Sequence, residues 1–153
     1  MNFVIENLVK RYNLKISGVI QIGAHWGEEN EQYLKSDIKN IVYIEPFSKS
    51  FQILESKFKN QRNTIIINKA IDNFEGSVDL NIESKNSGQS NSILNPKKHL
   101  EQYPDIIFDG IEKVKITRLK NLEIDFKNYN FLNIDIQGYE LEALKGAGDV
   151  LKK

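Results

Sequence analysis

Four short apolar runs divide the chain into alternating segments. They predict strands at residues 19–22, 41–44, 65–67 and 131–136, and the first is typical of a strand buried on both faces. Around them, apolar side chains recur at helical spacing and predict helices: residues 1–15, 28–35, 48–59 and 140–151. Because strand and helix alternate with few residues between them, the pattern predicts an α/β fold, with a parallel sheet, right-handed crossovers and helices on its faces.

Two of the predicted helices carry more detailed expectations. Ser48 precedes the apolar positions of its helix and is expected to be the N-cap. In the last helix, Leu141, Leu144 and Leu151 are expected to face the core.

Residues 76–122 depart from this alternation. Residues 77–82 and 114–116 alternate like exposed strands, whereas residues 84–95 are crowded with Ser, Asn and Gly. We expect an insertion over the sheet edge, in a position suited to a lid. No linker or repeat divides the chain, so residues 1–153 are expected to form a single domain.

Composition narrows the classes of function. The 153 residues include 21 basic and 21 acidic side chains, so the net charge is zero. Proteins that bind nucleic acid or an anionic membrane usually carry an excess of basic residues, which this chain does not have. There is no cysteine for disulfides or thiolate metal sites, and no apolar run approaches the roughly 20 residues of a membrane span. No His, Asp and Glu cluster has metal-ligand spacing. We therefore expect a cytoplasmic protein without a bound metal.

A glycine-containing turn follows the first predicted strand. Gly23-Ala24-His25-Trp26-Gly27 lies between that strand and the next helix. Gly23 permits a tight turn and Gly27 lets the helix start close to the strand, so backbone N–H groups would face an anionic or polar ligand. A turn needed only for packing remains an equal alternative.

Glu45 ends the second predicted strand, 22 positions after Gly23. A carboxylate about 20 residues after such a turn is placed to accept both hydroxyls of a ribose. The pair predicts a cofactor that contains a nucleoside, without choosing between a nicotinamide dinucleotide and S-adenosylmethionine. An acid at a strand end can otherwise be a surface or capping residue.

Asp135 lies near the end of the last predicted strand, within an otherwise apolar run. Burying a carboxylate there requires a ligand, a proton or a partner. The alternative is that Asp135 caps the next helix. The two histidines are weaker candidates: His25 is expected to shape the turn rather than act as a base, and His99 to be solvated.

The residues in four blocks closely resemble the FkbM-type S-adenosylmethionine-dependent methyltransferases. The blocks are residues 19–28, 43–46, 68–71 with Gly76, and 131–147. The resemblance implies a Rossmann-like class I methyltransferase sheet. It also implies S-adenosylmethionine held by residues 23–27, its ribose on Glu45, which Pro46 follows, and its adenine against Ala70, Ile71 and Asp72. Members generally methylate oxygen atoms, often hydroxyls of sugars or natural products.

The chain departs from the family pattern in two ways. Gln21 stands where the family usually has an acid, and Gln137 where many members have Glu. The sequence also stops at Lys153, so the last strands of the usual sheet are expected to be missing. The fourth strand would then have an exposed edge, which either reflects a truncated product or is covered by a partner chain, for example in a homodimer.

The most specific interpretation is therefore a methyltransferase that acts on a hydroxyl of a glycan or small molecule, with Asp135 as the base or the group that orients the acceptor. A non-catalytic domain that binds S-adenosylmethionine or a nucleoside is the alternative, favoured by Gln21 and by the early stop. A nicotinamide-dependent dehydrogenase is a third possibility, but the chain lacks the G-x-G-x-x-G spacing.

Overall fold

The computed structural model describes residues 4–85, 87–94 and 107–152. His99, which was expected to be solvated, lies outside these residues, as do parts of the predicted first helix and of the predicted insertion.

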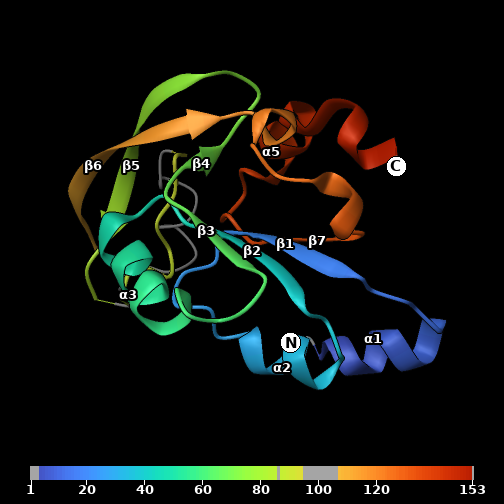
Figure 1. Cartoon of the computed structure of the whole chain (residues 1–153). Coiled ribbons are helices and arrows are strands. Elements are labelled where there is room, and N and C mark those ends of the chain that lie inside the picture. The colour runs from blue at the N-terminus through green and yellow to red at the C-terminus, as the bar shows by residue number, and fades with distance from the viewer. Residues whose placement is uncertain (1–3, 86, 95–106, 153) are drawn as a thin grey trace.

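The first sheet is parallel and four-stranded (Figure 1). Its order is β3-β2-β1-β7, and its strands are β1 (Gly18–Ile22), β2 (Asn40–Ile44), β3 (Thr64–Ile67) and β7 (Phe131–Ile134). The chain moves outward from β1 through β2 to β3 and returns to the other side of β1 as β7. The order therefore reverses at β1, where ligands bind in open sheets of this kind. The predicted α/β fold is confirmed.

Helices cover both faces of this sheet. On one face, Val19, Ile41 and Tyr43 pack with residues from three helices: α1 (Ile5–Tyr12), α2 (Asn30–Lys35) and α3 (Ser48–Phe58). On the other face, Ile20, Ile22 and Val42 pack with α5 (Glu140–Ala147) and with the segment that precedes β7. Alternate residues of β1 thus enter two different cores, which is why its apolar run is nearly continuous.

The inward face of α5 differs from the prediction. Leu141, Leu144 and Leu151 are exposed to solvent, whereas Ala143, Gly146 and Ala147 are buried. A Cβ atom on Gly146 would overlap the backbone carbonyl of Asp72. The helix packs too close to the neighbouring backbone for large side chains, so its small residues face inward.

Ser48 is the first residue of α3 and not its N-cap. Phe47 holds the cap position, and no side chain caps the helix. The Ser48 hydroxyl and backbone N–H both donate to Glu112, on a strand of the second sheet. The prediction of a Ser48 cap is therefore wrong, because a distant carboxylate takes the hydroxyl.

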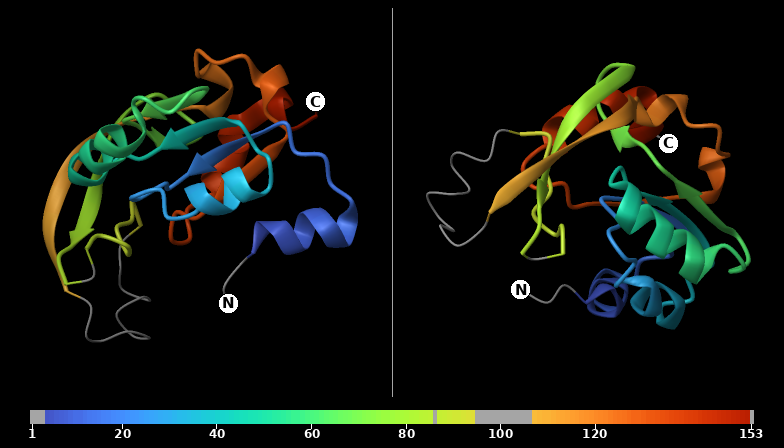
Figure 2. Two further views of the ribbon diagram at one scale, coloured as in Figure 1. Left: turned by 60° about the horizontal axis from the view of Figure 1, so that its bottom comes forward. Right: turned by 90° about the vertical axis from the view of Figure 1, so that its left-hand side faces the viewer.

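A second sheet stands beyond the carboxyl ends of the first (Figure 2). Its order is β4-β6-β5, built from β4 (Ala70–Ile71), β5 (Gly76–Glu83) and β6 (Phe108–Thr117). β5 and β6 pair antiparallel, and the short β4 pairs parallel with β6. An isolated bridge between Asn81 and Ser92 ties residues 87–94 to β5, and the Ser92 hydroxyl donates to the carbonyl of Gln137, which follows β7.

Two features of the whole chain bear on its surroundings. Within the described residues, β7 pairs only with β1 and so lies at the edge of its sheet. None of the helices in these residues has both the length and the apolar character needed to cross a membrane.

Candidate functional site

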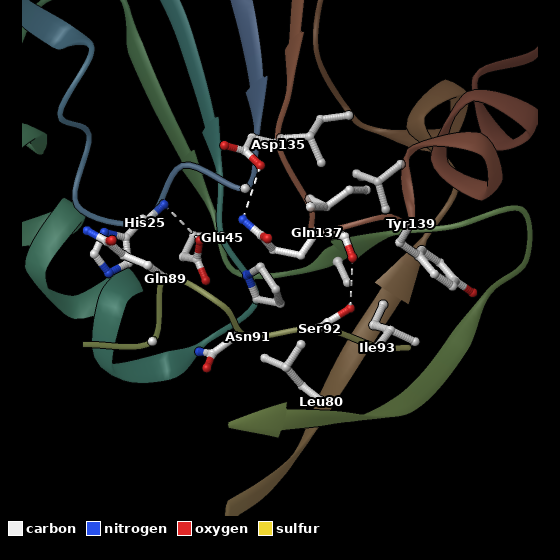
Figure 3. A pocket seen from close by; sticks show the side chains of 17 residues that line it. His25, Glu45, Leu80, Gln89, Asn91, Ser92, Ile93, Asp135, Gln137 and Tyr139 are labelled. Atoms are coloured by element: carbon white, nitrogen blue, oxygen red, sulfur yellow. Dashed lines mark hydrogen bonds between the residues drawn. The ribbon is translucent and has the colours of Figure 1, made fainter. Parts of the chain in front are cut away.

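A cleft opens between the two sheets (Figure 3). Its walls come from the carboxyl ends of β1, β2 and β7, from the second sheet and from residues 88–93. The lining residues are Ile22, Gly23, His25, Glu45, Pro46, Ala70, Ile71, Leu80, Gly88, Gln89, Asn91, Ser92, Ile93, Asp135, Ile136, Gln137 and Tyr139.

Glu45 is a buried carboxylate on the wall of the cleft, with 7% of its surface exposed. The backbone N–H of His25 donates to Oε2 at 2.8 Å, and that of Phe47 donates to Oε1 at 2.9 Å. Burial raises the pKa of Glu45 to about 7, although these two N–H groups oppose the shift. A carboxylate oxygen has two lone pairs, so each oxygen retains acceptor capacity toward the cleft.

The Gly23 turn does not offer free N–H groups to a ligand. Gly23 and Ala24 both donate to the carbonyl of Ile44, and Gly27 donates to that of Ala24. His25 and Trp26 donate to the carboxylates of Glu45 and Glu28. The expected row of exposed donors is thus wrong, because every N–H from residue 23 to residue 27 is taken up by the carbonyls of Ile44 and Ala24 or by the carboxylates of Glu45 and Glu28.

Both glycines of the turn are required by packing. Gly23 has φ +79° and Gly27 has φ +71°. A Cβ atom on Gly23 would overlap the carbonyl of Asp135, and one on Gly27 would overlap the Phe58 ring. Gly23 also lines the cleft, whereas Gly27 does not.

His25 links the turn to residues 87–94. Its ring stacks on Trp26 with the ring centroids 4.5 Å apart. Nδ1 lies 2.7 Å from Glu28 Oε1, and Nε2 lies 2.9 Å from the carbonyl oxygen of Ser87. The prediction that His25 shapes the loop is consistent with these contacts, which also reach across to a distant segment.

Asp135 follows β7 directly and lines the cleft next to Gly23. The Gln137 amide donates to Oδ1 at 3.3 Å. Partial burial and the nearby Glu140 raise the pKa of Asp135 above its ordinary value. Asp135 does not cap α5, which has no side-chain cap; the Glu140 side chain accepts the N–H groups of Ile136 and Gly138 in the loop before that helix.

The three residues predicted to contact adenine separate into two groups. Ala70 and Ile71 line the cleft with Leu80 and Ile93 and give it an apolar wall. Asp72 is fully buried outside that lining, where its Oδ2 accepts the Tyr139 hydroxyl at 2.8 Å. The structure therefore does not bring Asp72 to the cleft. Tyr139 instead lines the cleft and donates its hydroxyl to Asp72.

Gln21 faces away from the cleft. It is 3% exposed, accepts the Tyr33 hydroxyl and donates to Glu29 Oε2 at 2.7 Å. Glu29 does reach a polar extension of the cleft, which is lined by Gly23, Ala24, His25, Glu28, Glu29, Gln89, Asp135 and Gln137. The described lining of the cleft and its extension contains four carboxylates and no Lys or Arg.

Several lining residues were not singled out from the sequence. Tyr139 lies in the block with the strongest family resemblance, yet its contact with Asp72 spans 67 positions. Glu28 stands three positions after His25, which is a usable local signal. Gln89, Asn91 and Ile93 are part of the polar stretch expected as a lid, but no periodicity marked which of them face the cleft.

A parallel sheet with helices on both faces and a cleft at the carboxyl ends of its strands places the chain among the open α/β proteins, whose ligands bind at that edge of the sheet. A family model of the methyltransferase FkbM domain matches residues 21–153, and the chain belongs to this family. The family's activity is methyl transfer, and it generally uses S-adenosylmethionine.

One solved structure supports the fold assignment. The crystal structure of methyltransferase FkbM from Methylobacillus flagellatus KT superposes with a TM-score of 0.57 at 16% sequence identity. The match covers 88% of this chain and 29% of that one, so the chain spans less than a third of that protein's length. No curated protein sequence matches this chain.

Proposed function

We propose that this protein binds S-adenosylmethionine in the cleft and transfers its methyl group to a hydroxyl oxygen of a sugar, glycan or small molecule. The observation that carries the proposal is Glu45, a buried carboxylate fixed by two backbone N–H groups on the cleft wall. Its remaining lone pairs suit the two neighbouring hydroxyls of a ribose.

The charge of the site favours S-adenosylmethionine over a nicotinamide dinucleotide. A pyrophosphate needs free N–H groups or cations, and the turn at residues 23–27 has its N–H groups already paired. Glu28, Glu29 and Asp135 add negative charge to the polar extension. Carboxylates there attract a ligand with a sulfonium and an ammonium group and repel one with phosphates.

The residues present fit the two ends of this cofactor. Ala70, Ile71 and Leu80 would pack against adenine, with Ile93 on the opposite segment. Glu29, held by Gln21, supplies near the turn the carboxylate that Gln21 itself lacks, and it would hold the ammonium group. When bound, S-adenosylmethionine supplies a methyl group on a positively charged sulfur, open to in-line displacement by an oxygen.

Asp135 is proposed as the general base. The acceptor oxygen bonds to the methyl carbon as the carbon–sulfur bond breaks, and the hydroxyl proton passes to Asp135. A raised pKa suits this role, because it makes the carboxylate a stronger proton acceptor. The rest of catalysis is alignment of the two reactants and exclusion of water.

Two measurements test the proposal. Isothermal titration calorimetry should detect S-adenosylmethionine binding, and transfer of a labelled methyl group should be found within a panel of sugars and hydroxylated small molecules. Asp135→Asn should lower kcat by about 10²- to 10⁴-fold, a larger factor than the loss of cofactor affinity that follows from removing its charge. Absence of binding would refute the assignment, and an unchanged kcat would refute the role of Asp135.

A non-catalytic domain that binds S-adenosylmethionine is the second candidate. Gln21 favours it, because this residue provides no carboxylate and faces away from the cleft. Binding of the cofactor without methyl transfer to any acceptor in the panel would support this function instead.

A further inference from the structure

The strongest unexplained feature is the pair of contacts made by the His25 ring. Nδ1 faces a carboxylate oxygen of Glu28, and Nε2 faces the backbone carbonyl of Ser87, 62 positions away. Both partners can only accept a hydrogen bond while Glu28 is ionised. A neutral imidazole has one N–H, so one of the two contacts would bring lone pairs together; the doubly protonated ring satisfies both.

The segment that His25 holds forms part of the cleft wall. Gly88, Gln89, Asn91, Ser92 and Ile93 all line the cleft. Ser87 and Gly88 have φ values of +58° and +82°, so the segment begins with two left-handed residues. At its other end, Ser92 is tied to Asn81 and donates to the carbonyl of Gln137. His25 thus provides a contact at the entry to this segment, at Ser87.

The Glu28 side chain is itself fixed. Its Oε2 accepts the backbone N–H of Trp26 at 3.1 Å, while its Oε1 faces the His25 ring. The backbone N–H of His25 donates to Glu45, the residue proposed to bind the ribose. A charged His25 ring also favours the ionised form of Glu45. His25 therefore contacts the rest of the Gly23 turn, residues 87–94 and Glu45.

We infer that His25 is a positioning residue whose doubly protonated ring fastens residues 87–94 to the Gly23 turn, so that closing this wall over S-adenosylmethionine takes up a proton. The inference rests on the proposed function, because it assigns the wall a role in binding that cofactor. The charged groups around the ring are Glu28 and Glu29 of its own turn and helix start, Glu45 at the end of β2, Lys57 of α3, which donates to the Trp26 carbonyl, and Asp135 across the cleft.

The decisive variant is Glu28→Gln. A Gln side chain can accept the Trp26 N–H with its oxygen and donate from its amide to a neutral Nδ1, while Nε2–H still donates to Ser87. Residues 87–94 should then stay bound to the Gly23 turn without a second proton on the His25 ring. His25→Asn is the companion variant, because Asn tolerates a left-handed backbone such as the φ of +46° at His25 but cannot reach both partners.

The experiment measures S-adenosylmethionine affinity between about pH 5.5 and 9 by calorimetry, in buffers of different ionisation enthalpy. The His25 ring nitrogens are followed by ¹⁵N NMR in a His99→Gln background, which leaves a single histidine in the chain. Relative to Glu28→Gln at each pH, the parent should lose about tenfold in affinity as the ring loses its second proton, and it should take up more protons on binding. Glu28→Gln should lack this loss of affinity. Its affinity should depend only on Glu45, because the ionised form of Glu45 binds the cofactor and becomes more populated as pH rises. His25→Asn should bind about tenfold more weakly at low pH.

Hydrogen exchange of the amides of residues 87–94 separates this inference from the proposed function. In the cofactor-free parent, protection should decrease as the ring deprotonates, and in Glu28→Gln it should not. If no S-adenosylmethionine binds at any pH, the proposed function fails while the exchange data still test the fastening. Exchange or affinity that is independent of the ring's proton, or parent-like binding by His25→Asn, would overturn the role of His25.

Discussion

Three carboxylates at strand ends show how the surroundings of a residue decide its role. Glu45 is buried but faces the cleft, Asp72 is buried beneath Tyr139, and Asp135 is partly exposed at the mouth of the cleft. All three follow or end short apolar strands. Only their neighbours in space separate the proposed ribose ligand, Glu45, and the proposed base, Asp135, from the structural acceptor Asp72.

Glu45→Gln should change both the stability and the affinity of the protein. The pKa of Glu45 is about 7 in the folded protein and about 4.5 for an ordinary glutamate. At a pH between these two values, Glu45 keeps a proton in the folded chain that it has lost in the unfolded chain. The protonated carboxyl therefore stabilises the folded state fully below about pH 4.5, and this stabilisation is lost as pH rises through about 7. It amounts to at most about 3 kcal/mol.

Urea unfolding at about pH 5 and pH 8 tests this expectation. The parent should lose more stability over this interval than Glu45→Gln, and the variant should bind S-adenosylmethionine at least about tenfold more weakly. Identical pH dependence in the two proteins would contradict a buried, proton-binding Glu45.

Tyr139→Phe should destabilise the protein by about 1–3 kcal/mol. The substitution removes the hydroxyl that donates to Asp72 Oδ2, and Asp72 is fully buried. Chemical denaturation measures the change. Tyr12→Phe is the matched control, because Tyr12 is 59% exposed and should lie within about 0.5 kcal/mol of the parent. Equal stability of the two variants would show that Asp72 does not depend on Tyr139.

The sequence allows good prediction of site residues whose contacts are local in the fold. Gly23, Glu45 and Asp135 were recognised because each directly follows a short apolar run, and the ends of parallel strands meet at one edge. The contact between His25 and Ser87 could not be predicted, since it depends on how an irregular segment returns to the sheet. The paired N–H groups of the turn were missed for a related reason: their acceptors come from β2 and from side chains.

At the scale of elements, the strands were easier to predict than the orientation of the helices. Strands buried on both faces show continuous apolar runs, whichever neighbours they have. The inward face of α5 instead depends on how closely the helix approaches β4 and Asp72. That distance excludes leucine and selects Ala143, Gly146 and Ala147, which an apolar periodicity does not reveal.

Gly146→Ala should destabilise the protein by about 1–3 kcal/mol, or more, despite the better helix propensity of alanine. The added methyl group would overlap the Asp72 carbonyl, which is backbone and cannot move alone. Thermal or urea unfolding provides the measurement. Lys145→Ala in the same helix changes an exposed residue and should stay within about 0.5 kcal/mol; a stabilised Gly146→Ala would mean that α5 lies farther from β4.

At the scale of the whole molecule, the cleft lies between two sheets that meet at β4, where Ile71 packs in the core of the first sheet and Ala70 in that of the second. Ile22, Gly23 and Asp135 come from the first sheet, whereas Ala70, Ile71 and Leu80 come from the second. A ligand in the cleft contacts both units. It therefore adds binding energy to the folded state that the unfolded chain cannot gain.

S-adenosylmethionine at about 100 times its Kd should stabilise the protein by about 2.7 kcal/mol. Differential scanning fluorimetry over a range of cofactor concentrations measures the rise in Tm. The Glu45→Gln variant should need a higher concentration for the same rise. A Tm that does not change with cofactor would argue against binding to the folded chain.

The predicted homodimer would form at the exposed edge of β7. Within the described residues β7 has a strand neighbour on one side only, and an unpaired edge can add a strand from another chain. Light scattering should show a mass that rises with protein concentration toward twice that of the 17.7 kDa chain. A constant monomer mass would rule out this association.

The self-contained hydrogen bonding of the Gly23 turn limits which ligands this scaffold could acquire through later change. Surface substitutions can add a lysine near the cleft, but they cannot release amides that Ile44, Glu28 and Glu45 already hold. Adapting such a protein to phosphate-bearing cofactors would require rebuilding the junction between its first two strands. A change from one positively charged nucleoside derivative to another would leave this junction intact. Ligand specificity should therefore vary more readily among cationic nucleosides than toward phosphate-bearing ones.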